Sequence, residues 1–425
     1  MQAPAPGARP GVWKSIAIIG VLFFIFGFIT WLNGTLIPFL KLACELSDSE
    51  ALLVTFAFYM AYFFLALPSS RILKLTGFKK GMSLGLLIMA VGALTFIPAA
   101  VTRSFGLFLS GLFVQGMGLA LLQTASNPYV SIVGPIESAA RRISIMGICN
   151  KVAGALGQLI LSAIVLKGAE ALKNRLDAAG NAEVREQLLA ELAGRVIGPY
   201  LVMAGVLVLL AVMIRLSPLP EIDTDGDDSG QGGGAATSIL QFPHLLLGAL
   251  CIFVYVGAEV MAGDVIGPYG QKLGLSLDIT KYLTSATLTS MLVGYVLGIA
   301  LIPRVISQQT ALKFSAVVGL VFATIAYATS GLTSIVFIAL LGLANAPMWP
   351  AIFPLGIKGL GRFTKTGSAI LIMGIAGGAV IPQFWSRVLM GKLHVPAQSA
   401  FFWTTVPCYV YILFYAVVGH RARRR

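Results

Sequence analysis

Residues 239–270 read ILQFPHLLLGALCIFVYVGAEVMAGDVIGPYG, an apolar stretch that contains two carboxylates, Glu259 and Asp264. A helix of about 20 apolar residues crosses a bilayer core of about 30 Å, so this stretch is long enough to span a membrane. The chain has 17 acidic residues, and only these two lie well inside a hydrophobic stretch. A carboxylate at membrane depth costs about 2.5–3.5 kcal/mol on insertion scales, and it usually faces a polar cavity or an ion path. The stretch therefore predicts a membrane helix that carries a functional polar site.

The rest of the chain has the composition of a membrane protein. Hydrophobic residues make up 57% of it, charged residues 11%, and the mean hydropathy is +0.88, which excludes an ordinary soluble domain. Twelve apolar segments are long enough to span a bilayer, at roughly 15–41, 50–74, 81–101, 105–133, 140–167, 196–216, 239–271, 279–303, 310–330, 333–357, 366–391 and 399–419. Their length favours helices over barrel strands, which alternate over only about 10 residues. We therefore predict an all-α membrane protein with twelve transmembrane helices.

The formal net charge of +13 is distributed as expected for membrane topology. With the N-terminus in the cytoplasm, the inside connections hold most of the Lys and Arg residues, including four between 71 and 80 and the basic tail 421–425. In the longest outside connection, 168–195, acidic residues offset the basic ones. Because basic residues favour cytoplasmic loops, both termini are predicted to be cytoplasmic, and no nucleic-acid partner is expected. The short loops lead us to expect a multi-pass protein of a bacterial inner membrane.

A polar, Pro- and Gly-rich stretch, Ser217–Ser238, separates the first six segments from the last six. We predict an N-terminal six-helix bundle in residues 1–216, a cytoplasmic linker in 217–238 and a C-terminal six-helix bundle in 239–425. The linker resembles the start of a calcium loop, but an EF-hand needs Gly at position 6 and Glu at position 12, where Asp228 and Gly234 stand. The four cysteines have no CxxC spacing. We expect no metal site and no cofactor apart from a coupling ion.

Similar proline motifs recur in the two halves. Gly34–Pro38 in span 1 corresponds to Asp264–Pro268 in span 7, and Asn127–Tyr129 in span 4 corresponds to Asn345–Trp349 in span 10. A proline inside a spanning helix frees a backbone carbonyl, which is tolerated where protein or a water-filled cavity satisfies it. Broken helices at matching positions in two halves indicate a transporter site at the repeat interface. The repeat therefore predicts breaks in spans 1, 4, 7 and 10.

Five motifs, in this order along the chain, carry a resemblance to a known family: Phe24–Pro38, Gly118–Tyr129, Cys149–Lys151, Tyr255–Glu259 and Leu355–Gly361. With six spans on each side of a central linker, the chain resembles the major facilitator superfamily and, within it, the fucose–galactose–glucose:proton symporter family. The resemblance implies a secondary transporter for hexoses or related sugars, with alternating access between two six-helix bundles. It also implies acidic coupling residues, typically Asp at position 34 and in some members Glu at 123. This chain has Gly34 and Gln123 there, so coupling through those positions is in doubt.

A sugar presents hydroxyl groups that both donate and accept hydrogen bonds, so its site needs amides, carboxylates and an aromatic face. The candidate substrate-binding residues are Asn33, Gln123, Asn127, Asn150, Glu259, Asn345 and Trp349. Each amide lies inside an apolar span, where it would be costly if left without a partner. The alternative is that some of these amides only hold helices together, and that Trp349 packs against lipid or protein.

The candidate ion-coupling residues are Lys151, Glu259 and Asp264. Lys151 lies near the middle of span 5, where it either pairs with one of the two acids across the bundle interface or extends toward the membrane surface. Asp264 stands at the position that corresponds to Gly34, and we expect it to replace the acid missing there. Five residues separate Glu259 from Asp264, about 140° of rotation in an ideal helix, so they share a face only if 263–268 is unwound.

We expect a secondary active transporter, acting as a monomer in the bilayer, that imports a hexose-type sugar by proton or sodium symport. Glucose, galactose, fucose and N-acetylglucosamine remain open as substrates. The alternatives are an antiporter or exporter of sugars or drugs, an uncoupled sugar uniporter, and a non-transporting scaffold. The amides favour sugars over lipophilic drugs, which prefer apolar walls. Nothing in the sequence resembles an ATP-binding loop with Lys and Ser/Thr, so no enzyme activity is expected.

Overall fold

A computed structural model describes residues 10–132, 139–179, 181–217 and 238–421, and every element in these ranges is a helix. The fold class predicted from the sequence is therefore confirmed. The linker predicted at 217–238 lies outside the described residues except at its two ends, so its boundaries stay a prediction.

Ten helices lie in the described residues of the N-terminal bundle. They are α1 (Pro10–Thr30), α2 (Asn33–Ala43), α3 (Asp48–Ala51), α4 (Leu53–Leu94), α5 (Phe96–Val101), α6 (Phe105–Ile132), α7 (Ala139–Val165), α8 (Ala169–Asp177), α9 (Ala182–Gly194) and α10 (Ile197–Leu216). The helices α8 and α9 lie in the connection between spans 5 and 6, where the mixed-charge loop was predicted.

The C-terminal bundle comprises α11 to α20 and short 3₁₀ or π segments. They are η2 (Ile239–Gln241), α11 (Pro243–Gly263), α12 (Ile266–Lys272), α13 (Leu277–Thr280), α14 (Leu283–Leu301), α15 (Gln308–Ala328), α16 (Gly331–Asn345), α17 (Met348–Ile357), η3 (Gly361–Phe363), α18 (Thr364–Met373), η4 (Gly374–Ala376), α19 (Gly377–Gln383), η5 (Phe384–Lys392), α20 (Ala397–Val417) and η6 (Gly419–Arg421). The run from α18 to η5 is continuous and forms span 11.

The described residues contain eleven helical stretches that are long and apolar enough to cross a membrane. One of them, Asp48–Val101, has 54 residues, which is too long for a single crossing. It turns back at Gly77, whose φ of 76° breaks the helix inside α4. Gly81 then packs so closely against Leu73 that a Cβ at position 81 would overlap the leucine side chain. Counted as two spans, this hairpin completes the predicted twelve.

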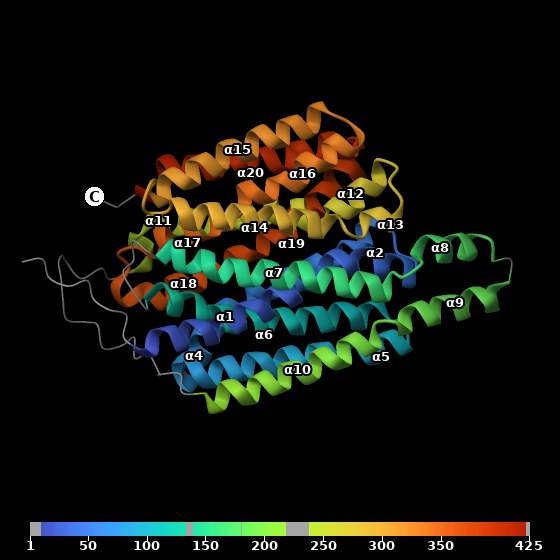
Figure 1. Ribbon diagram of the computed structural model, residues 1–425, viewed down its shortest axis with the longest axis horizontal. Helices are drawn as coiled ribbons and strands as arrows, with labels where there is room; N and C mark the ends of the chain where they lie inside the picture. Colours follow the sequence, from blue (N-terminus) through green and yellow to red (C-terminus); the bar gives the residue numbers. More distant parts are fainter. Residues whose placement is uncertain (1–9, 133–138, 180, 218–237, 422–425) are drawn as a thin grey trace, which may run out of the picture.

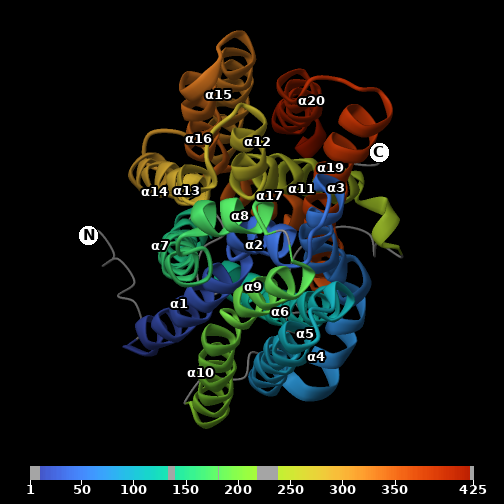
Figure 2. The same ribbon diagram turned by 90° about the vertical axis from the view of Figure 1, so that its right-hand side faces the viewer.

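The two bundles lie side by side, as Figure 2 shows with the N-terminal helices below and the C-terminal helices above. The helices α8, α9 and α13 lie at one end of the molecule, which we call the distal end, and η6, the last described element, lies at the opposite end (Figure 1). Within each bundle, small residues allow close helix packing, as at Gly85 of α4 and Gly118 of α6, where each Cβ would overlap the other backbone.

Within the described part of the chain, three spans are interrupted near their middle. Span 1 breaks at Trp31–Leu32 between α1 and α2, span 7 at Asp264–Val265 between α11 and α12, and span 10 at Ala346–Pro347 between α16 and α17. The break predicted in span 4 is wrong, because α6 continues to Ile132. A proline leaves a carbonyl in the preceding turn without its usual donor. In span 4 that carbonyl is the one of Thr124, four residues before Pro128, and next to it the side-chain Nδ2 of Asn127 donates to the carbonyl of Gln123 at 3.1 Å within α6.

Candidate functional site

The breaks of spans 1 and 7 touch each other at the interface between the bundles. Trp31 follows α1 directly, and its indole ring packs on Gly263, the last residue of α11. On the N-terminal side the ring packs on Gly154 of α7, where a Cβ would lie 2.5 Å from Trp31 Cδ1. A side chain at either glycine would overlap the indole, so these two glycines and the 2% exposed Trp31 define one close contact between the bundles.

A buried ion pair lies beside this contact. Lys151 Nζ of α7 is 3.1 Å from Glu259 Oε1 of α11, and the exposed fractions of the two side chains are 6% and 11%. The same ammonium lies 4.0 Å from the centroid of the Trp31 ring, in cation–π geometry. The predicted pairing of Lys151 with span 7 is therefore present, and its direct partner is Glu259. The alternative in which Lys151 extends toward the membrane surface is wrong for this structure.

A central cavity of about 90 Å³ opens onto the ion pair. Six of the predicted site residues line it: Gln123, Asn127, Asn150, Lys151, Glu259 and Trp349. A single water needs roughly 10–15 Å³ by this kind of measure, so the cavity is large enough for several waters or for part of a polar ligand. Amides, an ion pair and aromatic rings that converge on one space can recognise a small ligand rich in hydroxyl groups.

The cavity amides are held by aromatic side chains. Trp31 Nε1 donates a hydrogen bond to Asn150 Oδ1 at 3.2 Å. Gln123 Nε2 and the Tyr62 hydroxyl are hydrogen-bonded at 3.0 Å. Trp349 is half-buried and packs against Phe353, with ring centroids 5.7 Å apart. Each amide therefore has one end fixed in the protein and can offer the other to a ligand.

Most of the aromatic residues that line this cavity are not among the residues predicted from the sequence. Besides Trp31 they include Tyr59 and Tyr62 of α4, Tyr255 of α11 and Tyr295 of α14. All four tyrosines are almost fully buried. A usable signal was present, because a tyrosine well inside an apolar span brings a hydroxyl that needs a partner there.

Two predicted substrate residues lie outside the cavity. Asn345 is fully buried at the end of α16, and its Oδ1 accepts a hydrogen bond from the Tyr409 hydroxyl at 2.9 Å. This geometry favours the interpretation in which Asn345 holds helices together. Asn33 is also fully buried, at the first residue of α2, and neither of its side-chain amide atoms has a hydrogen-bond partner among the described residues.

Asp264 lies in the break of span 7, fully buried and outside the cavity lining. Its Oδ2 is 3.5 Å from the Tyr59 hydroxyl of the N-terminal bundle, and its Oδ1 has no partner among the described residues. Tyr59 itself lines the cavity, so this hydroxyl connects the cavity wall to the carboxyl group.

Two threonines of α14 satisfy carbonyl groups next to this break. Thr284 Oγ1 donates to the carbonyl of Gly263 at 2.8 Å, and Thr287 Oγ1 donates to the carbonyl of Ala262 at 2.7 Å. Thr284 also packs against Gly34, where a Cβ would overlap the threonine hydroxyl. Any larger residue at position 34, an aspartate included, would have to displace the side chain of Thr284.

The helix breaks give a different correspondence between the halves from the proline motifs. Trp31 and Asp264 each follow the first half-helix of their span directly, whereas Gly34 lies one residue inside α2. By its position at the helix break, Asp264 of the C-terminal half therefore corresponds to Trp31 of the N-terminal half. Asp264 occupies a helix break in span 7, while position 34 is a helical packing site.

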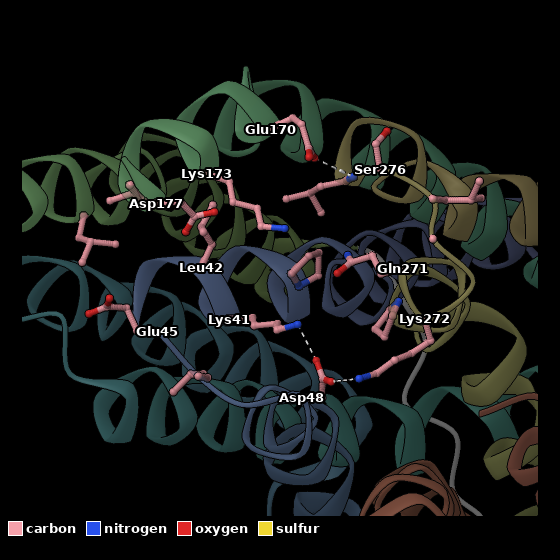
Figure 3. Close-up of a pocket in the computed structure, with 18 of the residues that line it drawn as sticks. Lys41, Leu42, Glu45, Asp48, Glu170, Lys173, Asp177, Gln271, Lys272 and Ser276 are labelled. Atoms are coloured by element: carbon pink, nitrogen blue, oxygen red, sulfur yellow. Dashed lines mark hydrogen bonds and ion pairs between the residues drawn. The ribbon is translucent and has the colours of Figure 1, made fainter. Parts of the chain in front are cut away.

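A second, larger cavity of about 640 Å³ lies at the distal end, between the two bundles and α8 (Figure 3). Asp48 forms ion pairs there with Lys41 of the N-terminal bundle, at 2.5 Å, and with Lys272 of the C-terminal bundle. Glu170 of α8 accepts a hydrogen bond from the backbone N–H of Leu277 at 3.1 Å. These contacts tie the bundles together at the distal end.

Comparison with known proteins gives consistent matches over nearly the whole chain. The sequence profile of the Major Facilitator Superfamily matches residues 19–383. A glucose/galactose transporter of Brucella abortus biovar 1 (strain 9-941) is 34% identical over 416 residues, which cover 96% of this chain and 94% of the relative. The L-fucose-proton symporter of Escherichia coli (strain K12) is 28% identical, covering 90% and 88%. The crystal structure of the Escherichia coli fucose:proton symporter superposes with a TM-score of 0.76 at 25% identity, covering 96% of this chain and 99% of that one.

Proposed function

This chain belongs to the major facilitator superfamily, in the group of the glucose/galactose transporters and fucose–proton symporters, and we propose that it imports a hexose-type sugar by proton symport. The observation that carries the proposal is the central cavity, where amides from one bundle and a carboxylate from the other face the same space. A ligand bound there contacts both bundles, so its binding can be coupled to their relative movement.

The chemistry of the cavity supports a sugar as the substrate. Gln123 and Asn150 can hydrogen-bond to hydroxyl groups, Glu259 can accept from them, and the ring of Trp349 offers an apolar face to the sugar carbons. A lipophilic drug would leave these buried polar groups without partners, at a cost of about 1–3 kcal/mol for each group. Glucose, galactose and fucose are the first candidates, because the relatives are named for them.

The surroundings of Asp264 support a proton as the coupling ion. A sodium site in a broken helix uses several oxygen ligands, including unwound backbone carbonyls. The carbonyls of Ala262 and Gly263 already accept hydrogen bonds from Thr287 and Thr284, and Lys151 is engaged by Glu259. A buried carboxylate without a cation is costly, so we propose that Asp264 carries a proton in this conformation.

The proposed membrane orientation follows from the basic residues. Lys79 and Lys80 belong to the turn of α4, and Lys79 Nζ donates to the carbonyl of Ser217 just after α10. This turn and η6, which contains Arg421, lie away from the distal end (Figure 1). Because such residues favour the cytoplasmic side, we propose that the distal end faces outward and that both termini are cytoplasmic, in a bacterial inner membrane.

Uptake into proteoliposomes tests the proposal. Labelled glucose, galactose, fucose and N-acetylglucosamine are offered separately, with an inward proton gradient or an inward sodium gradient. We expect at least one hexose to accumulate above its external concentration only with the proton gradient. Accumulation driven by sodium alone, or no uptake of any of the four sugars, would contradict the proposal.

A sugar uniporter is the second candidate, and one observation favours it. Positions 34 and 123, which carry coupling acids in members of the resembling family, are Gly34 and Gln123 here. A uniporter would equilibrate the sugar across the vesicle membrane with either gradient and would accumulate it with neither.

A further inference from the structure

We propose that Trp31 is a specificity-determining residue of this site, because it fixes the Asn150 side chain so that Asn150 offers only hydrogen-bond donors to the sugar. This inference rests on the proposed sugar transport and deepens it. It concerns the direction of one hydrogen bond between protein and substrate.

The position of Trp31 is fixed by its packing. The indole lies between Gly154 and Gly263, and the Lys151 ammonium lies 4.0 Å from its centroid. Only 2% of the residue is exposed. With a bundle on each side and a cation over its face, the ring has little freedom to turn, so its N–H points in one direction.

The hydrogen bond from Trp31 fixes which end of Asn150 faces the cavity. An indole Nε1–H is a donor only, so the atom 3.2 Å from it must be the amide oxygen of Asn150. The NH₂ group of Asn150 is then left for the cavity. Gln123 differs, because its partner is the Tyr62 hydroxyl, which can either donate or accept. The Gln123 amide can therefore reverse, whereas the Asn150 amide cannot.

The site therefore requires a hydrogen-bond acceptor at one position of the sugar and a hydrogen-bond donor at another. Asn150 requires an acceptor at one position of the sugar, such as a hydroxyl oxygen or the ring oxygen. The Glu259 carboxylate accepts only, so it requires a hydroxyl proton at another position. A fluorine atom can accept weakly but cannot donate, so fluorodeoxy sugars distinguish the two demands.

The experiment compares deoxy and fluorodeoxy analogues of the best transported hexose as competitors of labelled sugar uptake, position by position. For the wild-type protein we expect one position at which the fluorodeoxy sugar competes nearly as well as the parent, while the deoxy sugar competes about tenfold less well, or about 1.4 kcal/mol. In Trp31→Phe the Asn150 amide is free to reverse. We expect the advantage of fluoro over deoxy at that position to fall by about twofold, because the NH₂ group then faces the sugar in only about half of the molecules.

Two further variants keep the result interpretable. Trp385→Phe is the matched control, because Trp385 is 1% exposed, donates its Nε1–H to the Ala397 carbonyl at 3.3 Å and lies outside the cavity lining. Its analogue profile should equal that of the wild type. Asn150→Asp keeps an acceptor for Trp31 but replaces the donor by an oxygen. At the same sugar position it should now prefer the parent hydroxyl over fluorine, whether or not Trp31→Phe folds.

The outcomes separate this inference from the proposed function. If the wild type transports a hexose but shows no position that tolerates fluorine and rejects hydrogen, the inference is wrong. An unchanged profile in Trp31→Phe, or a retained preference for fluorine in Asn150→Asp, overturns it as well. If the wild type transports none of the sugars, the proposed function fails first.

Discussion

At the scale of single residues, the buried pair of Lys151 and Glu259 is the contact on which the site depends. Two buried charges are compatible with a stable fold only while they are paired with each other. Removing one partner of such a pair lowers the free energy of unfolding by about 3–5 kcal/mol. The cation–π contact with Trp31 adds a third group to the same cluster. The pair also joins α7 to α11, and therefore one bundle to the other.

Lys151→Ala should abolish transport and lower the thermal unfolding temperature in detergent, because Glu259 is left buried without a partner. The double variant Lys151→Ala/Glu259→Gln should recover most of the lost stability but not the transport. Arg185→Ala is the matched control. It breaks a half-exposed pair with Glu45 inside the N-terminal bundle and should cost less than about 1 kcal/mol. A stable Lys151→Ala single variant would show that the pair is not maintained in the membrane.

Gln123→Ala and Asn345→Ala should have different effects, although both remove a buried amide. Gln123 lines the cavity, so its removal should weaken sugar affinity by about 1–3 kcal/mol while the folded protein is retained. Asn345 lies outside the cavity lining and accepts from Tyr409, so its removal should lower the unfolding temperature and leave sugar affinity nearly unchanged. Equal sugar affinities in Gln123→Ala and the wild type would remove Gln123 from the site.

At the scale of helices, the breaks in spans 1 and 7 form a contact between the two bundles. They bring Trp31 against Gly263 and place Asp264 in a short non-helical connection. The freed carbonyls next to Asp264 are satisfied by α14. The break therefore depends on packing against a neighbouring helix as well as on its own sequence.

Gly263→Ala should reduce transport strongly and destabilise the fold by about 1–3 kcal/mol, because the added Cβ overlaps the Trp31 ring and overpacks the bundle interface. Gly205→Ala in α10 is the matched control, since a Cβ there meets nothing within 4 Å and should be neutral or slightly stabilising. Sugar uptake and unfolding temperature are measured for both. Normal uptake in Gly263→Ala would mean that the two breaks are not in close contact.

The sequence predicts the helices better than the contacts between them. Hydropathy alone locates all twelve spans, because each must cover the same bilayer thickness. The prolines locate the breaks only approximately: the break in span 1 lies seven residues before Pro38, and span 4 does not break at all. A proline removes one donor, but tertiary partners such as Thr284, which donates to the carbonyl of Gly263, decide where the helix actually opens.

For the site, the sequence identifies the charged and amide residues but not how they combine. A lysine in an apolar span must find an acid, yet Glu259 and Asp264 are equally available in the sequence, and only the packing of α7 on α11 selects Glu259. The aromatic lining could not be separated from lipid-facing aromatics by hydropathy. In the sequence, Asn345 is a substrate candidate because it is an amide inside an apolar span, whereas its side chain turns toward Tyr409 in α20.

At the scale of the whole molecule, the contacts at the distal end define the conformation. Lys272 forms an ion pair with Asp48, and Glu170 accepts a hydrogen bond from the backbone N–H of Leu277 (Figure 3). These two contacts hold the bundles together at the distal end. Gln158 Nε2 and Ser162 Oγ of α7 also donate to the carbonyl of Lys281, at 3.4 Å and 3.2 Å. A transporter that alternates between two conformations must release these contacts before its distal end can open.

Lys272→Ala should make the distal end open more often. In a Cys44→Ser background, a reporter cysteine introduced by Leu42→Cys in the distal cavity should react several-fold faster with a membrane-impermeant thiol reagent, since about 1 kcal/mol of bundle contact is lost. Arg185→Ala again serves as the control, because its ion pair lies within one bundle. Equal reactivity in the two variants would mean that Asp48–Lys272 does not hold the distal end closed.

We propose that Asp264 couples sugar movement to a proton gradient, and the variant Asp264→Asn tests this role most directly. The asparagine imitates the protonated acid in shape and charge and cannot release a proton. In proteoliposomes with an imposed proton gradient, the variant should fail to accumulate the sugar above its external concentration. Sugar exchange across equal gradients should persist, because exchange does not require the proton to leave. Normal accumulation by Asp264→Asn would contradict the account and make Glu259 the next candidate for the coupling acid.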